Sequence, residues 1–236
     1  MSSRAEAHAD FHRRLLDAAH RRMAAEGAAG LGMRMLARDL GVTPGALYRY
    51  VRSRDELLTL LVIDAYTSLG DAAAEAEDAV PRGDVEGRWV AVWRAAHAWA
   101  RNHPHEYALI HGTPVAGYRA PQETVGPGTR LNLILARIAA DLPVVAHPPD
   151  AEPLPKGLAD DVQRIRDWLA TEQVPTTQVP DAAILAVTQG LGTLIGTISL
   201  ELFGHFTGGI EHPREFVEHA ARRTFEEVRR ATGHGG

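Results

Sequence analysis

The stretch that decides the fold runs from Met33 to Arg54 and reads MRMLARDLGVTPGALYRYVRSR. Leu36 and Leu40 lie four residues apart, so they share one face of a helix. Gly41 follows the last apolar position, where glycine adopts the left-handed conformation that ends a helix at little cost. Thr43 is placed to cap a new helix with its hydroxyl. The window therefore predicts a helix, a tight turn and a second helix.

The second helix is predicted to begin at Pro44, because proline is favoured in the first turn of a helix. Leu47 returns an apolar side chain to the small core, and Gly45 allows a close approach by DNA. Hydroxyl and guanidinium groups on the outward face can donate to phosphates or base edges. Ser53 is placed to cap a third helix, whose first amides suit a phosphate. The predicted DNA-contacting residues are Thr43, Pro44, Gly45, Tyr48, Arg49, Tyr50 and Arg54.

Each of these residues also has a simpler explanation. Tyr48 and Tyr50 can be packing residues, Arg49 and its neighbouring arginines can be solvated charges, and Gly45 can be a residue that starts a helix. A small residue (Ala37), a turn glycine (Gly41), a capping residue (Thr43) and a proline (Pro44) nevertheless occur at the required spacing within one short window. That combination favours a DNA-binding helix-turn-helix over a chance pattern.

The same window carries a family resemblance. LARDLGVTPGALYRYVRSRDELL is similar to the N-terminal signature of TetR-family regulators, and LLDAAHRRMAAEG, from Leu15 to Gly27, is similar to the helix that braces it. The resemblance implies a homodimeric repressor that binds a palindromic double-stranded DNA operator and is released by a small apolar or aromatic effector. It also implies the DNA contacts named above. One departure is Gly32, which stands where the family commonly has a serine or threonine and cannot supply a hydroxyl to phosphate.

Charge and composition agree with this interpretation. The formal net charge is −5, yet residues 1–56 hold ten arginines against seven acidic residues, so the basic charge is concentrated at the helix-turn-helix end. The chain has no cysteine, which excludes disulfides and thiolate metal sites. The longest apolar run, near Gly190 to Gly204, contains Glu201 and is expected to be too short to cross a membrane. We expect a cytoplasmic protein.

The chain as a whole predicts an all-α fold of two domains. Residues 1–56 are expected to form the three-helix DNA-binding domain, and residues 57–236 a helical bundle for ligand binding and dimerisation. Helical periodicity recurs between loops rich in proline and glycine, without the alternating pattern of strands. The segment from Asn102 to Pro121 resembles the C-terminal regulatory domain of a TetR subfamily frequent in actinobacteria.

Aromatic side chains with polar tips suggest a mostly apolar cavity for the effector. The candidate pocket residues are Trp89, Trp93, His97, Tyr107, His111, Tyr118 and Trp168. For each of them an ordinary position in the core is the simpler alternative. The histidine spacings match no metal-ligand pattern, no cofactor motif is present, and no catalytic constellation is recognisable, so neither a metal site nor an enzyme is predicted.

Small residues on the most apolar predicted helix suggest a surface that a helix of a second subunit can approach closely. The candidate dimer-interface residues are Ala186, Gly190, Thr193 and Thr197. The alternative is that this helix is buried within one subunit, since glycine also serves close packing inside a domain. Two other classes of function stay open: a small-molecule carrier without an operator, and a helical enzyme fused to a DNA-binding module.

Overall fold

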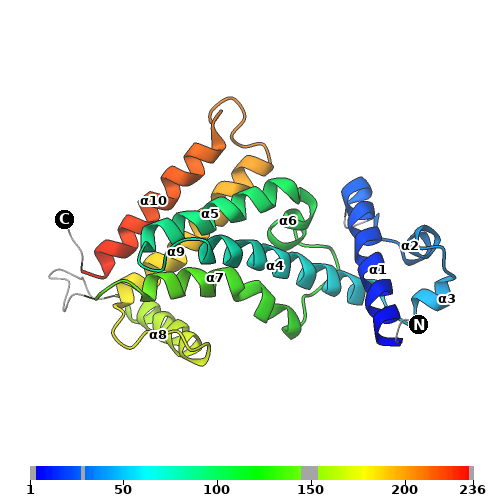
Figure 1. The fold of residues 1–236 in the computed structure, drawn as a ribbon, viewed down its shortest axis with the longest axis horizontal. Coiled ribbons are helices and arrows are strands. Elements are labelled where there is room, and N and C mark those ends of the chain that lie inside the picture. The colour runs from blue at the N-terminus through cyan, green and yellow to red at the C-terminus, as the bar shows by residue number, and fades with distance from the viewer. Residues whose placement is uncertain (1–3, 28–29, 145–153, 234–236) are drawn as a thin grey trace. The chain divides into compact units, whose positions relative to one another are not determined.

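The structure is a computed structural model that describes residues 4–27, 30–144 and 154–233. These residues form helices and connecting turns and include no strand, which confirms the predicted all-α class. The helices are α1 (Arg4–Glu26), α2 (Met33–Asp39), α3 (Pro44–Leu47), α4 (Arg54–Asp78), α5 (Val85–Asn102), α6 (Pro104–His111), the short 3-10 helix η2 (Gln122–Thr124), α7 (Val125–Ala140), α8 (Lys156–Thr171), α9 (Asp181–Leu202) and α10 (Pro213–Ala231). Figure 1 traces them in chain order from blue to red.

The chain divides into two compact units that do not coincide with the predicted domains. The N-terminal unit comprises Met1–Ser68 and His103–Gly128, and the C-terminal unit comprises Leu69–Asn102 and Thr129–Gly236. The expected boundary at residue 56 instead falls within the first turn of α4. Because α4 continues through this point without a break, and α6 belongs to the N-terminal unit, a division after the third helix of the motif does not separate the packing.

The core of the N-terminal unit includes Leu36, Leu40 and Leu47, which the sequence placed on apolar helix faces. Leu15 and Ala19 of α1 are fully buried, and so is Leu47 of α3. Three leucines of α4 complete the cluster, which explains why α4 cannot be separated from the helices before it. The cluster is formed by Phe11, Leu15, Ala18, Ala19, Leu31, Met33, Leu36, Ala37, Leu40, Leu47, Val51, Leu57, Leu58 and Leu61.

The C-terminal unit is organised around α9, which packs extensively against α10 and also contacts α5 and α8. Figure 1 shows α5, α9 and α10 running beside one another in this unit. Trp89 of α5 is fully buried at this junction, where its Nε1 donates to Oγ1 of Thr224 over 3.3 Å. Its ring centroid lies 6.1 Å from that of Phe225. Large aromatic rings therefore fill the space between the helices.

A buried arginine joins three elements of the C-terminal unit. The side chain of Arg88 is only 1% exposed. Its Nε donates to Glu77 Oε1 over 2.6 Å, and its Nη1 donates to Asp141 Oδ2 over 2.6 Å and to the carbonyl of Arg82 over 3.3 Å. A buried cation is tolerated when it is paired and hydrogen-bonded in this way. The network thereby ties α5 to the end of α4 and to the residue after α7.

Candidate nucleic-acid interface

The turn between α2 and α3 has the geometry that its sequence predicts. Gly41 adopts φ +68°, the left-handed conformation. Its amide donates to the carbonyl of Arg38 over 3.1 Å, and the amide of Val42 donates to that of Ala37 over 2.9 Å. These two bonds form a Schellman motif, which satisfies carbonyls that the end of α2 leaves open. The positive φ requires glycine, so the predicted role of Gly41 is confirmed.

The start of α3 is capped as the sequence predicts. Thr43 Oγ1 accepts a hydrogen bond from the amide of Ala46 over 3.2 Å, and Pro44 occupies the first turn. Regular helix ends at Leu47, after which the turns through Tyr50 continue with shorter-range hydrogen bonds. The recognition element is thus a short helix extended by a tight turn.

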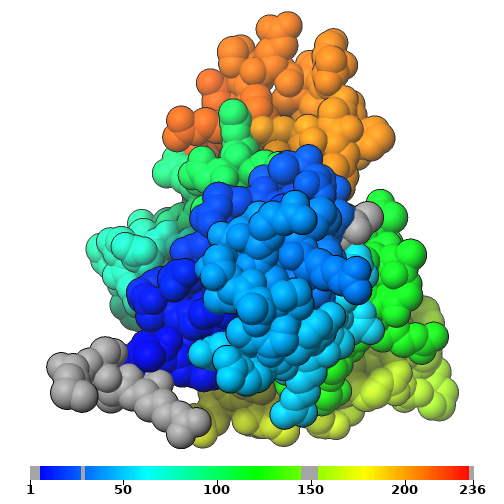
Figure 2. All heavy atoms as spheres, turned by 90° about the vertical axis from the view of Figure 1, so that its right-hand side faces the viewer, coloured from blue at the N-terminus to red at the C-terminus, as the bar shows by residue number. Residues whose placement is uncertain are grey.

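The outward face of this element is open to solvent. Thr43, Pro44, Gly45 and Arg49 are exposed, and Tyr48 is 47% exposed although it follows the fully buried Leu47. A Cβ added at Gly45 would meet no atom within 4 Å. Neither the backbone conformation nor internal packing therefore demands glycine there. A missing side chain at an open position favours close approach by an outside partner. Figure 2 shows the surface that α1, α2 and α3 form, in blue.

Tyr50, which is also a predicted DNA contact, packs against α1. Its ring stacks on Phe11 of α1 with a centroid distance of 4.0 Å and an interplanar angle of 28°. A second ring, that of His8, lies 5.2 Å away. Tyr50 is partly buried against the core cluster, so its ring braces α1 against the turn after α3. The simpler explanation, a packing residue, is the one that the structure favours.

Two side-chain hydrogen bonds cap the N-terminus of α4. Ser53 Oγ accepts from the amide of Glu56 over 3.1 Å, which confirms the predicted cap. Glu56 Oε2 in turn accepts from the amide of Arg52 over 2.6 Å. This reciprocal arrangement resembles a capping box. Arg54 is the first residue of α4 and is partly buried.

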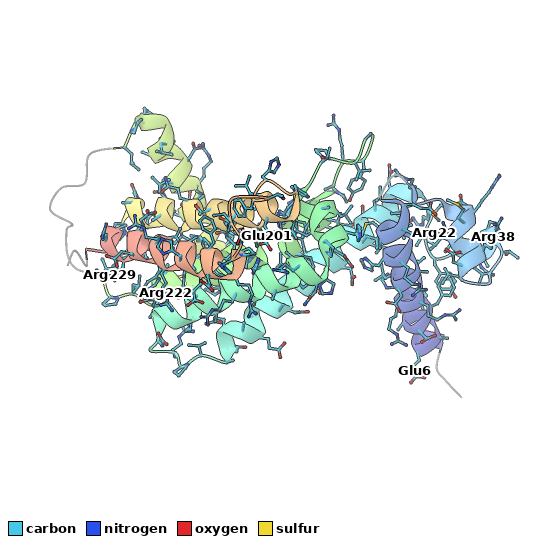
Figure 3. All side chains as sticks on the ribbon, turned by 90° about the horizontal axis from the view of Figure 1, so that it is seen from above. Glu6, Arg22, Arg38, Glu201, Arg222 and Arg229 are labelled. Atoms are coloured by element: carbon cyan, nitrogen blue, oxygen red, sulfur yellow. The ribbon has the colours of Figure 1, made fainter. Side chains whose placement is uncertain are left out.

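Two arginines on α2 extend the exposed basic surface beyond the predicted residues. Arg34 and Arg38 are both exposed, opposite the buried Leu36 and Ala37. Figure 3 labels Arg38 on this helix. The first helix of a helix-turn-helix crosses the DNA backbone, so cations on its polar face suit phosphates. Their spacing relative to Leu36 and Ala37 could have predicted from the sequence that both arginines lie on the exposed face of α2.

Ion pairs hold α1 against its neighbours in the N-terminal unit. Arg22 of α1 donates from Nη2 to Asp39 Oδ1 over 3.0 Å, and this hydrogen bond holds the pKa of Asp39 below its usual range. Nε2 of His20 lies 2.8 Å from Asp64 Oδ2 of α4, and Nδ1 of the same ring lies 3.4 Å from Glu106 Oε1 of α6. The imidazole is thus hydrogen-bonded to α4, whereas its buried Nδ1 has no hydrogen-bond partner among the described residues.

The predicted pocket residues of the N-terminal unit fall into two places. Tyr107 is buried, and its ring lies 5.0 Å from that of His111, while Tyr66 approaches His111 edge-on at 5.9 Å. Burial lowers the pKa of His111 to about 4 and raises the pKa of Tyr66. Tyr118 instead faces Thr59, with 3.0 Å between their hydroxyl oxygens. Tyr66 was not predicted, because on an apolar helix nothing distinguishes it from a core residue.

The predicted pocket residues of the C-terminal unit are mostly core. Trp89 packs against Thr224 and Phe225, which agrees with the simpler alternative of a core position. Trp93 is fully buried, and its Nε1 has no hydrogen-bond partner among the described residues. His97 is also buried, with Nε2 2.6 Å from Glu201 Oε2. Trp168 lies on a different helix, α8, and is partly exposed.

The predicted dimer-interface row is mostly covered within the chain. Ala186, Gly190 and Thr197 are buried, and only Thr193 is exposed. A Cβ on Gly190 would lie 3.0 Å from Cζ2 of Trp89. The prediction is corrected for the three buried residues, because intramolecular packing already fills the space beside them.

Two helices are long and apolar enough to cross a membrane by length and composition, namely α4 and α9. This corrects the expectation that the apolar run in α9 is too short. Half of the most apolar window of α4 and 44% of that of α9 are buried within the structure. Core helices of soluble proteins meet the same criteria.

Within the described ranges, no group of three or more histidine or acidic side chains is placed to hold a metal ion.

Comparisons with known proteins agree with this geometry. Residues 15–61 match the family described as bacterial regulatory proteins, tetR family, and residues 89–224 match the tetracyclin repressor-like C-terminal domain. The HTH-type transcriptional regulators Rv1816 of Mycobacterium tuberculosis and Mb1846 of Mycobacterium bovis are each 33% identical over 208 residues, covering 87% of this chain and 86% of theirs.

Solved structures show the same fold. That of regulatory protein SCO4313 has a TM-score of 0.77 at 28% identity, covering 95% of this chain and all of that one. PfmR from Thermus thermophilus, a TetR family transcriptional regulator, has a TM-score of 0.53 at 17% identity over 90% of this chain and 97% of its own. These relatives are regulators rather than enzymes. The chain belongs to the TetR family of DNA-binding transcriptional regulators.

Proposed function

We propose that this regulator acts in the cytoplasm as a homodimeric repressor, which a small apolar or aromatic effector releases from a palindromic operator. The observation that carries the proposal is the exposed face of α3 over the fully buried Leu47. Two such faces in a symmetric dimer would reach successive major grooves of a palindrome. In this proposal residues 1–56 contact DNA, and residues 57–236 supply the effector site and the dimer interface.

The residues have separate roles on DNA. Gly45 allows α3 to approach closely, and the hydroxyl of Tyr48 and the guanidinium of Arg49 reach the bases or the phosphates of the major groove. Arg34 on α2 and Arg54 at the start of α4 contact phosphates on either side. Each phosphate contact contributes to affinity by releasing counterions, so binding is expected to weaken steeply with salt.

The dimer interface is proposed on the exposed side of α9, opposite the side that covers Trp89. Gln189, Gly192, Thr193 and Leu200 are exposed there. A Cβ on Gly192 or Gly196 would meet no atom within 4 Å. Two open glycines four residues apart let another helix approach closely, and the apolar Leu200 beside them favours a protein partner over solvent.

Gly192→Leu tests this interface, because the added side chain would start from a Cβ that touches nothing within the chain. Sedimentation should show a monomer for this variant and a dimer for the parent protein. Arg223→Gln, on an exposed position of α10, is the control and should remain dimeric. A dimer of unchanged stability in Gly192→Leu would contradict the placement of the interface.

The effector is proposed to be small and mostly apolar, with a hydrogen-bond acceptor. The buried indole N–H of Trp93 has no acceptor among the described residues. An unpaired buried donor costs about 1–3 kcal/mol, so an oxygen of a bound molecule there would be stabilising. An effector of this kind lowers operator affinity only through its preference for the conformation that does not fit DNA.

The DNA assignment is tested by measuring operator binding against salt, with duplexes from the intergenic region upstream of the gene. Tyr48→Phe should weaken binding several-fold through a lost hydrogen bond. Arg49→Gln should weaken it further and make the slope of log K against log salt shallower by about one unit. Arg223→Gln removes the same charge from α10 and should leave the slope unchanged. Parent-like binding by both Tyr48→Phe and Arg49→Gln would refute the assignment.

A further inference from the structure

A large polar cleft lies within the C-terminal unit, between the last turns of α5 and the first turns of α10. Its volume is about 870 Å³, which is in the range of small-molecule sites. The charged side chains that line it include Arg94, Arg101 and Arg214, with Glu215 and Glu218. The cleft uses neither the helix-turn-helix nor the buried tryptophans. The kind of ligand that the cleft can bind follows from which of these charged groups already have hydrogen-bond partners within the chain.

The carboxylate of Glu218 is already satisfied. Glu218 Oε2 accepts from Nε of Arg94 over 3.0 Å, and its Oε1 accepts from Nη2 of Arg222 over 3.0 Å. These hydrogen bonds lower the pKa of Glu218, so it is ionised and neutralised at neutral pH. A cationic ligand would have to displace an arginine to reach it.

A second carboxylate, that of Glu201, is engaged by two residues that line the cleft, His97 and Arg101. Glu201 accepts from Nε2 of the buried His97 over 2.6 Å and from Nη1 of Arg101 over 3.3 Å. Figure 3 labels Glu201 on α9. With both oxygens occupied, Glu201 is also a poor site for an added cation. Among the described lining residues, the acid for which no bond is found is Glu215.

Hydrogen-bond donors, by contrast, remain available. Arg214 is exposed and makes no hydrogen bond or ion pair within the described chain. Arg101 is 48% exposed, and its long contact to Glu201 occupies one of its five N–H groups. The side chain of Asn102 also lines the cleft. Two guanidinium groups with free donors outweigh the one free carboxylate, so the cleft is suited to an oxyanion.

We propose that this cleft binds a small organic carboxylate, with Arg101 and Arg214 donating to its oxygens. Guanidinium groups bind carboxylates in a planar, two-bond geometry, which makes them selective for this chemistry over neutral groups. The bound carboxylate competes with Glu201 for Arg101. Binding therefore changes the pairing between α5 and α9, which connects the site to the core of the unit.

The test uses the full-length protein without DNA and benzoate as the probe. Titration is followed by the Nε–Hε resonances of the arginine side chains, with benzamide as a neutral molecule of the same shape and benzamidine as a cationic one. Benzoate should shift the resonances of Arg101 and Arg214 saturably, and the two controls should not. An equal response to benzamide, or no saturable response to benzoate, would overturn the proposal.

Variants locate the site. Arg214→Gln should weaken benzoate binding about tenfold, the loss of one charge-assisted interaction. Arg101→Gln should weaken it to a similar extent. Arg223→Gln, on the same helix but outside the cleft, is the charge-matched control and should bind benzoate as the parent does. Because the exposed Arg214 makes no polar contact within the described chain, its replacement should leave the urea midpoint unchanged. Unchanged affinity in Arg214→Gln would refute the assignment.

Carboxylate binding in this cleft does not rest on the proposed function, because it requires neither an operator nor the effector site proposed at Trp93. A benzoate site that follows the variants above supports the cleft even where the operator assay fails. Operator binding that follows Tyr48→Phe and Arg49→Gln, but with no benzoate site, would overturn the cleft and leave the repressor proposal standing.

Discussion

Replacing Gly190 with alanine should destabilise the protein, although alanine favours helices more than glycine does. The added Cβ would lie 3.0 Å from Cζ2 and 3.3 Å from Cη2 of Trp89, and 3.7 Å from Cβ of Thr224. The indole has little freedom to retreat, because its Nε1 is hydrogen-bonded to Thr224 and its ring is fully buried beside Phe225. Gly190→Ala should therefore strain the contact between α9 and Trp89 of α5.

The magnitude follows from two opposing contributions. The gain in helix propensity is about 0.5–1 kcal/mol, and overpacking of a filled core costs about 1–3 kcal/mol. The free energy of unfolding should fall by roughly 1 kcal/mol. For a chain of this length, that loss corresponds to a Tm lower by about 2–4 °C.

Gly192→Ala is the matched control, because its Cβ would meet no atom within 4 Å on the same helix. In the monomer it should gain about 0.5–1 kcal/mol from helix propensity, whereas in the dimer the added methyl group would meet the partner's helix. Urea unfolding followed by tryptophan fluorescence measures both variants, at two protein concentrations so that dimerisation is separated from folding. If Gly190→Ala were as stable as Gly192→Ala, the packing of α9 against Trp89 would be wrong.

Three further predictions concern single side chains. Thr43→Ala should lower the free energy of unfolding by about 1 kcal/mol through loss of the α3 cap, and Thr43→Ser should restore it in chemical denaturation. Arg88→Gln should cost about 3–5 kcal/mol, because Glu77 and Asp141 would lose their buried partner; a loss below about 1 kcal/mol in the same assay would contradict that network. His111 has a pKa near 4 in the folded state against 6.5 when unfolded, so the unfolded state takes up its proton first as the pH falls. Stability should therefore be complete above pH 6.5 and decline towards pH 4, by at most about 3 kcal/mol. His111→Phe should make the pH dependence of urea unfolding shallower, and an unchanged pH profile would argue against a buried neutral imidazole.

The helix-turn-helix was predictable because its determinants are local. Gly41 adopts a positive φ. Thr43 and Ser53 each cap a helix by accepting from the amide three residues later. Leu47 follows the helical periodicity of apolar residues. Each of these features depends on neighbours in sequence, which the sequence displays directly. The all-α class followed from the same periodicity repeated along the chain.

What the sequence could not show depends on partners distant in the chain. Tyr50 and Tyr48 look equivalent in sequence, and only the position of Phe11 decides that one packs and the other faces solvent. On α9, Gly190 and Gly192 likewise look equivalent in sequence, and only the structure shows which of them faces Trp89. The buried position of Arg88 is not visible in the sequence either, because its partners Glu77 and Asp141 lie 11 and 53 residues away from it.

The N-terminal unit is made of two segments, and this limits how the protein can be cut and recombined. A fragment ending at residue 56 would lack Leu57, Leu58 and Leu61, which are fully buried, and Glu106, which faces His20. A chimera that exchanges only the first three helices with another regulator would join mismatched cores. A functional graft of DNA specificity into this scaffold must carry residues 103–128 together with residues 1–68.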